Sequence, residues 1–233
     1  MKLLISPIDI EEAKDAEAGG ADIIDVKNPK EGSLGANFPW VISAVKKVVS
    51  KPLSATIGDF GFKPGTASLS ALGAAVAGAD FIKIGLFDIS TKEQALTLLQ
   101  NVKKAVKDYD SSKKVVAAAY ADFERLNTLS PFDLPDVGQK AGIDIVMIDT
   151  GIKDGRGIFD FLSKGQVAEF TSSAKEVGLG TALAGSLGWG DIKTIHRISP
   201  DIIGIRGLVC GGDRNRRIQQ KEVERLKKMI CSI

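Results

Sequence analysis

The sequence has few of the residues that mark several common classes of protein. It contains only two cysteines in 233 residues, Cys210 and Cys231, which excludes a disulfide framework and indicates a reducing compartment. It contains a single histidine, His196, which argues against most zinc sites and against any mechanism that needs two imidazoles. We therefore expect no metal centre.

Charge of one sign and long apolar runs are also missing. The 31 Lys and Arg residues nearly balance the 29 Asp and Glu residues, for a formal net charge of +2. Such a balance gives no reason to expect nucleic acid or an anionic membrane as a partner. No apolar run approaches the about 20 residues that cross a bilayer, and the apolar start at residues 1–5 ends too early for a signal peptide. The sequence predicts a cytoplasmic protein.

A repeating unit is present instead. Short runs rich in Val, Ile and small residues alternate with amphipathic stretches of helix length, as expected for parallel strands covered by helices. We predict strands at residues 3–6, 23–27, 53–57, 81–86, 115–120, 145–150, 181–186 and 202–207. We predict helices at residues 10–18, 40–49, 68–77, 92–108, 136–141, 165–177, 191–198 and 222–230.

Eight such alternations predict an α/β protein with one domain over residues 1–233, a (β/α)₈ TIM barrel. The alternative is an open, doubly wound sheet. That fold usually has a glycine-rich dinucleotide fingerprint after its first strand, whereas residues 6–9 read Ser-Pro-Ile-Asp. No linker or low-complexity stretch divides the chain.

Charged residues stand at the ends of four predicted strands, where the active site of such a barrel lies. Because side chains alternate along a strand, packing the branched residues against the helices turns the charged ones into the barrel. The residues placed inside in this way are Asp25, Lys27, Lys83, Asp149 and Arg206, with Lys153 close behind on a loop. A structural ion network is the alternative for any one of them, but their convergence on one end favours a catalytic site.

Two lysines at a dry barrel mouth suggest Schiff-base chemistry. A lysine whose pKa is lowered by burial or a nearby cation can condense with a carbonyl, and a second base can then remove the adjacent proton. Lys27 and Lys83 supply the two groups, and their spacing does not say which does which. The polar loop at residues 28–35, directly after Lys27, is either a lid or a connection.

A second candidate site is a phosphate cradle. The loops after the seventh and eighth strands are rich in glycine, and in this fold those loops commonly bind phosphate through backbone N–H groups. Arginine there adds a charge-assisted contact. The predicted phosphate-binding residues are Gly185, Ser186, Arg206, Gly207, Gly212, Asp213 and Arg214.

Longer strings give a family resemblance. Residues 25–36 read DVKNPKEGSLGA and follow GGAD at residues 19–22. Further strings stand at residues 63–66, 83–86, 119–122, 149–150, 152–155, 159–161, 184–186 and 212–214. On these strings, which cover nearly the whole chain, the sequence resembles the (5-formylfuran-3-yl)methyl phosphate synthases, also called 4-(hydroxymethyl)-2-furancarboxaldehyde-phosphate synthases.

The resemblance implies a lyase of methanofuran biosynthesis with a TIM-barrel fold and no organic cofactor. It implies that two molecules of glyceraldehyde 3-phosphate condense with loss of phosphate and water, with Lys27 forming the Schiff base and Lys83 accepting the proton. We expect Asp25, Asp149 and Lys153 to position groups and transfer protons. The substrate is then a small triose phosphate, and a homo-oligomer is possible. Two alternatives stay open, a Schiff-base aldolase acting on triose or deoxypentose phosphates and a non-catalytic barrel that binds sugar phosphates.

Overall fold

The computed structural model describes residues 1–59 and 61–232, and its centre is a closed barrel of parallel strands in sequence order. The strands are β1 (Lys2–Ile5), β2 (Ile23–Val26), β3 (Leu53–Asp59), β4 (Phe81–Gly85), β5 (Lys114–Tyr120), β6 (Ile145–Asp149), β7 (Gly180–Leu183) and β8 (Ile202–Ile205). Strand β1 pairs with β2 on one side and with β8 on the other, which closes the barrel.

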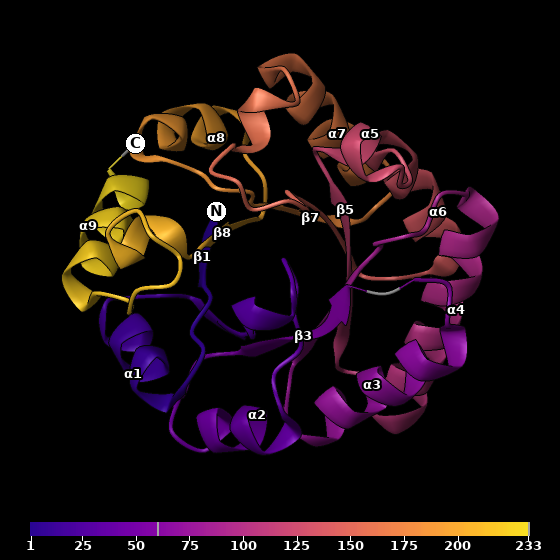
Figure 1. Ribbon diagram of the computed structural model, residues 1–233, viewed down its shortest axis with the longest axis horizontal. Helices are drawn as coiled ribbons and strands as arrows, with labels where there is room; N and C mark the ends of the chain where they lie inside the picture. Colours follow the sequence, from indigo (N-terminus) through magenta and orange to yellow (C-terminus); the bar gives the residue numbers. More distant parts are fainter. Residues whose placement is uncertain (60, 233) are drawn as a thin grey trace.

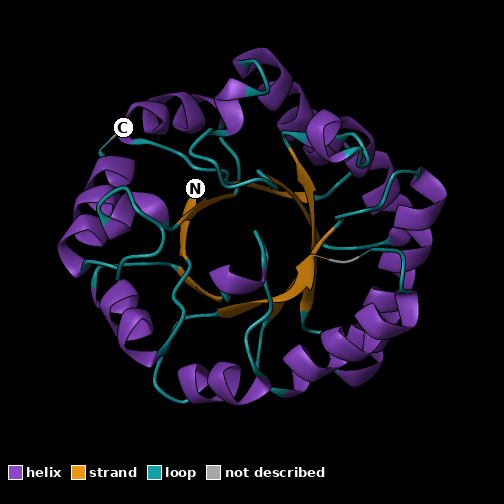
Figure 2. Ribbon diagram, in the orientation of Figure 1, coloured by secondary structure: helices purple, strands orange, loops and turns teal. Residues whose placement is uncertain are grey.

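Helices surround the strands (Figure 1). The α-helices are α1 (Ile10–Ala18), α2 (Pro39–Lys46), α3 (Pro64–Val76), α4 (Lys92–Tyr109), α5 (Phe123–Leu126), α6 (Leu134–Ala141), α7 (Lys164–Glu176), α8 (Ile192–Ile198) and α9 (Gln220–Cys231). Short 3₁₀ helices are η1 (Pro29–Glu31), η2 (Pro131–Asp133), η3 (Ile158–Asp160), η4 (Trp189–Asp191) and η5 (Gly207–Cys210). One short helix lies inside the ring of strands in Figure 2, and its colour in Figure 1 identifies it as η1.

Helix α4 shows why these segments fold as they do. The Thr91 side chain accepts a hydrogen bond from the Gln94 N–H, which satisfies one of the free donors of the first turn. Its buried side chains recur every three or four residues and face the barrel: Ala95, Leu98, Leu99, Val102 and Val106. The opposite face is polar, so the helix packs by one side only.

Side chains alternate along the strands as the sequence predicts. Ile24 and Val26 of β2 belong to the apolar layer between strands and helices, as do Ile82 and Ile84 of β4. A second, smaller cluster fills the inside of the barrel and includes Leu4, Ile23, Val116, Met147 and Ile202. The charged residues at the strand ends therefore begin on the inner side.

The closed barrel confirms the predicted (β/α)₈ fold and excludes the open sheet. All eight predicted strands and all eight predicted helices are present, with ends that differ by a few residues. The sequence analysis missed α5 and the 3₁₀ helices, which are too short for a periodic pattern. In the part of the chain that the structure describes, no helix is both long enough and apolar enough to cross a membrane.

Candidate active site

Asp25 and Lys83 form a fully buried ion pair at the mouth of the barrel. Lys83 Nζ donates to Asp25 Oδ2 at 2.7 Å, Ser54 Oγ donates to Oδ1 at 2.6 Å, and Ser6 Oγ donates to Oδ2 at 2.9 Å. Burial acts to raise the pKa of Asp25, but the charges of Lys83 and Lys27 and these hydrogen bonds together hold it below the ordinary value. The carboxylate is thus ionised and held by side chains of β3, of β4 and of the residue that follows β1.

Asp149 and Lys153 form a second ion pair. Lys153 Nζ donates to Asp149 Oδ1 at 2.6 Å and to Thr150 Oγ1 at 2.9 Å, and the Thr150 N–H donates to the same carboxylate oxygen at 2.7 Å. Burial acts to raise the pKa of Asp149. The charges of Lys153 and Lys27 and these hydrogen bonds act in the opposite direction and outweigh burial, so the pKa lies below its ordinary value. Asp122 fixes the loop that carries Lys153 by accepting from the N–H groups of residues 151 and 152.

Lys27 differs from both of these lysines. Only 7% of its surface is exposed, yet no carboxylate of the described residues lies within ion-pair distance of its amine. Burial is the largest cause that lowers the pKa of Lys27 to about 7, with Lys83 and Lys153 acting in the same direction and Asp149 and Asp25 acting against it. Near neutral pH a large fraction of this amine is therefore unprotonated and nucleophilic.

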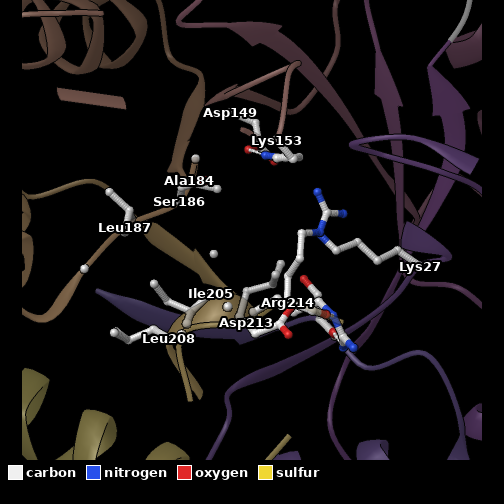
Figure 3. A pocket seen from close by; sticks show the side chains of 18 of the residues that line it. Lys27, Asp149, Lys153, Ala184, Ser186, Leu187, Ile205, Leu208, Asp213 and Arg214 are labelled. Atoms are coloured by element: carbon white, nitrogen blue, oxygen red, sulfur yellow. Dashed lines mark hydrogen bonds and ion pairs between the residues drawn. The ribbon is translucent and has the colours of Figure 1, made fainter. Parts of the chain in front are cut away.

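A cavity of about 500 Å³ opens over these groups, at the carboxyl ends of β6, β7, β8 and β1. Figure 3 shows Lys27 and Arg214 pointing into it, with Asp149 and Lys153 on another wall. The predicted site residues that line it are Lys27, Lys83, Asp149, Lys153, Gly185, Ser186, Arg206, Gly207, Gly212, Asp213 and Arg214. Asp25 lies behind Lys83 and does not line the cavity. The structure thus brings the two sets of predicted residues into one site.

Arg206 lines the cavity, but its guanidinium is occupied. All five N–H groups donate to protein oxygens, two of them through the ion pair with the buried Glu12 of α1. Its bonds to the Ser6 carbonyl and to Glu12 join the end of β1 to that helix. The predicted contact between Arg206 and a phosphate is therefore disfavoured, because no N–H remains free.

Arg214 shows the opposite arrangement. Its Nη2 atom is buried and has no hydrogen-bond partner among the described residues. Nearby, Gly185 (φ 102°) and Ser186 (φ 48°) bend the loop after β7 with left-handed backbone conformations, which is unusual for serine. A free guanidinium opposite a sharply turned backbone is suited to an anion.

The loop at residues 28–37 covers the other side of the mouth. Leu34 is fully buried inside the barrel, and its N–H donates to Asp59 Oδ2 at 3.0 Å. Ser33 Oγ donates to the Thr150 carbonyl at 2.7 Å, and Thr56 Oγ1 donates to the Gly35 carbonyl at 2.7 Å. These bonds to β3 and to the end of β6 make the loop a fixed plug rather than a simple connection.

Sequence reasoning missed the residues that hold these charged groups. Ser6, Asp59 and Asp122 stand at or just after the carboxyl ends of strands, which is the position that selected the lysines. Ser54 lies near the start of β3, level with Asp25, so only alternation along that strand could have selected it. Glu12 has no such signal, because it lies in the first turn of a helix where acidic residues are common. Among the described residues, no three His, Cys, Asp or Glu side chains are grouped so that they could hold a metal ion.

The closed parallel barrel with ionisable groups at its carboxyl end is that of a TIM-barrel enzyme, and one of its buried lysines has no carboxylate partner among the described residues. The family comparison is more specific. The chain belongs to the 4-HFC-P synthase family, whose model matches residues 3–227. This confirms the family identified from the sequence strings.

Relatives of known name agree with this assignment, and solved structures share the fold. The chain is 63% identical to the (5-formylfuran-3-yl)methyl phosphate synthase of Methanosarcina acetivorans, with 97% of each chain covered. It is 54% identical to the protein of the same name from Archaeoglobus fulgidus, with 99% of each chain covered. Orotidine 5'-phosphate decarboxylase from Pyrococcus horikoshii matches with a TM-score of 0.67 at 16% identity over 99% of this chain and 100% of that one, a likeness of fold alone.

Proposed function

We propose that this enzyme condenses two molecules of glyceraldehyde 3-phosphate into 4-(hydroxymethyl)-2-furancarboxaldehyde phosphate in methanofuran biosynthesis. Two triose phosphates give the six carbons of the product, with loss of one inorganic phosphate and water. The observation that carries the proposal is the buried, unpaired Lys27 amine with its pKa lowered to about 7. Membership of the synthase family supports the choice of product.

In the first step, the Lys27 amine attacks the aldehyde carbon of one triose phosphate. The Lys83 ammonium, held at 2.7 Å from Asp25, donates a proton to the hydroxyl that leaves as water, and a protonated imine remains. Lys83 is then a neutral amine and takes the proton from the neighbouring carbon. The product of these steps is an enamine, and the pair of Lys83 and Asp25 regains its original charge.

The enamine attacks the aldehyde of the second triose phosphate. The addition leaves an imine on Lys27. Asp149 and Lys153, an ion pair on another wall of the cavity, supply and accept protons as phosphate and water are eliminated, and hydrolysis of the imine frees the Lys27 amine. The phosphate that remains lies against the backbone of Gly185, Ser186, Gly207 and Gly212, with Arg214 as its cation. Asp213 contributes its backbone, because its carboxylate repels an anion. A cytoplasmic location and a homo-oligomeric state stay predictions.

Borohydride reduction tests the covalent step. Treated with glyceraldehyde 3-phosphate and borohydride, the protein should gain the mass of one reduced adduct, and peptide mass spectrometry should place it on Lys27. Lys27→Ala should lose the adduct and all product. Lys30→Ala, on the exposed part of the same loop, is the matched control and should keep both.

Two results would contradict the proposal. An adduct on Lys27 accompanied by a simple aldol product, without the absorbance of a furan aldehyde, would indicate a Schiff-base aldolase. Binding of the triose phosphate with neither adduct nor turnover would indicate a barrel that binds sugar phosphates without catalysis.

A further inference from the structure

The guanidinium of Arg206 makes more hydrogen bonds to the protein than expected for a side chain that binds a substrate phosphate. Its Nε donates to the Arg214 carbonyl at 2.7 Å, and its Nη1 donates to the Ser6 carbonyl at 2.7 Å and to Glu12 Oε2 at 2.8 Å. Its Nη2 reaches Glu12 Oε1 at 3.5 Å and the Arg216 carbonyl at 3.3 Å. The guanidinium thus joins the end of β1, helix α1 and the loop at residues 212–217.

Two of these five bonds hold that loop. The loop's other polar contacts are local or exposed. The Gly212 N–H donates to the Gly207 carbonyl at 2.9 Å, and the N–H groups of Asn215 and Arg216 donate to Asp213. The pairs of Arg216 with Asp213 at 3.7 Å and of Arg217 with Asp9 at 4.0 Å are open to solvent. A surface contact of this kind contributes little to the position of a loop. The carbonyls of Arg214 and Arg216 are therefore its buried attachment to the barrel.

The charge of Arg206 is neutralised where it lies. Glu12 is fully buried, and it also accepts from the Ile8 N–H at 3.1 Å, so the pair adds no net charge to the cavity. Arg214, by contrast, keeps a buried Nη2 without a partner while its own carbonyl is held by Arg206. The backbone of Arg214 is fixed, and its side chain is left free for a ligand.

We propose that Arg206 is a positioning residue, held by Glu12, that fixes the loop at residues 212–217 so that Arg214 binds the phosphate of the substrate. The inference rests on the proposed function in taking a phosphate ester as substrate. It assigns the two arginines different roles, although both stand in the loops expected to bind phosphate. Lysine cannot replace arginine at 206, because one ammonium cannot make five bonds in a fixed plane.

Binding of glycerol 3-phosphate tests this role. That compound carries the phosphate but has no aldehyde, so its affinity depends neither on Lys27 nor on furan formation. In calorimetric titrations, Arg206→Lys should weaken binding at least tenfold, and Arg214→Gln should do the same. Arg217→Lys, on the same loop with a side chain that is mostly exposed, should bind as the unmodified protein does.

A double substitution separates positioning from direct contact. If Arg206 acts through Arg214, adding Arg206→Lys to Arg214→Gln should reduce the affinity no further. Borohydride trapping with unphosphorylated glyceraldehyde should proceed at the same rate in Arg206→Lys and in the unmodified protein, since that substrate lacks the group that Arg214 binds. A general structural defect would slow it.

Three results would overturn the inference. They are unchanged affinity for glycerol 3-phosphate in Arg206→Lys, additive losses in the double variant, or slowed trapping of glyceraldehyde. If Arg206→Lys does not fold, Glu12→Gln carries the test, because it keeps the shape of the pair and removes one charge. It should weaken binding severalfold, and unchanged binding would refute the role of the pair.

Discussion

The two sides of the barrel mouth are built in different ways. Over β3 to β6, the loop at residues 28–37 buries Leu34 and is bonded to side chains and carbonyls of the strands. Over β6 to β8, glycine-rich loops leave a cavity of about 500 Å³. One side is closed by apolar packing and the other is open to a polar ligand. The backbone of Lys27 leads into the loop on the closed side, whereas its side chain lines the cavity on the open side.

Charge is distributed accordingly. The buried carboxylates at the mouth are neutralised, Asp25 by Lys83, Asp149 by Lys153 and Glu12 by Arg206. Among the described residues that line the cavity, Lys27 and Arg214 are the cations without such a partner. The protein thus keeps its buried ions paired and leaves two basic side chains without a carboxylate partner. In the proposed function, the neutral amine of Lys27 is the nucleophile and Arg214 binds the phosphate.

The largest expected effect comes from opening the closed side. Leu34→Ala should lower the free energy of unfolding by about 3 to 5 kcal/mol, because it leaves a cavity in the cluster that fills the inside of the barrel. Leu208→Ala, a cavity-lining residue on the open side, should cost less than about 1 kcal/mol, because it is only partly buried. Urea denaturation measures both, and equal losses would refute the contrast between the sides.

Removing the free amine should stabilise the protein. Lys27→Met should raise the free energy of unfolding by roughly 2 to 4 kcal/mol at pH 6, because a lysine with a lowered pKa is charged at a cost there. Between pH 7 and about 10.5 the unfolded chain binds the extra proton, so the unmodified protein gains stability and the difference should shrink. Lys30→Met is the exposed control. A difference independent of pH would contradict the lowered pKa.

On the open side, Arg214→Gln should weaken substrate binding rather than the chemical steps. We expect the KM for glyceraldehyde 3-phosphate to rise about 10- to 100-fold, the range that loss of a charge-assisted contact gives. In the proposed function Arg214 binds the phosphate and not the reacting carbons, so kcat should change by less than about threefold. Arg217→Gln serves as the control in steady-state kinetics. A fall in kcat with an unchanged KM would place Arg214 in the chemistry.

The smallest effects concern the pair on the border between the sides. Asp149 raises the pKa of Lys27 and Lys153 lowers it, so Asp149→Asn should lower the pKa and Lys153→Met should raise it, each by about one unit. Imine trapping needs the neutral amine, and the midpoint of its pH profile should move in the same two directions. Shifts of the same sign in both variants would contradict this account.

The barrel and the positions of the charged side chains at its mouth were predictable from the sequence, whereas the partners of those side chains were not. Eight apolar runs with alternating inner and outer residues predict a closed barrel, and the same alternation places Asp25, Lys83 and Asp149 inside. It also places Arg206 at the mouth. The Arg206 guanidinium pairs with Glu12 because its long side chain reaches across the end of β1, and the alternation of residues along a strand does not predict that reach.

The state of Lys27 was likewise beyond the sequence. Three lysines at one mouth look alike in a pattern, and what separates them is whether a carboxylate lies near enough to pair. Asp25 on β2 pairs with Lys83 on β4, 58 residues further along the chain, because the closed barrel turns both side chains to a common interior. The distance between a lysine amine and a carboxylate at this mouth depends on the closed sheet and on the side-chain rotamers, not on spacing along the chain.

Gly85, the last residue of β4, lies where three side chains of the closed side pack together. A side chain there would meet the Tyr120 hydroxyl, the Asp59 carboxylate and, at 3.0 Å, Leu34. Tyr120 donates to Asp59, which in turn holds the plug through the Leu34 N–H. One methyl group at position 85 would therefore push on all three at once. An engineer seeking room for bulkier aldehydes should leave this strand end alone and vary the loops after β7 and β8.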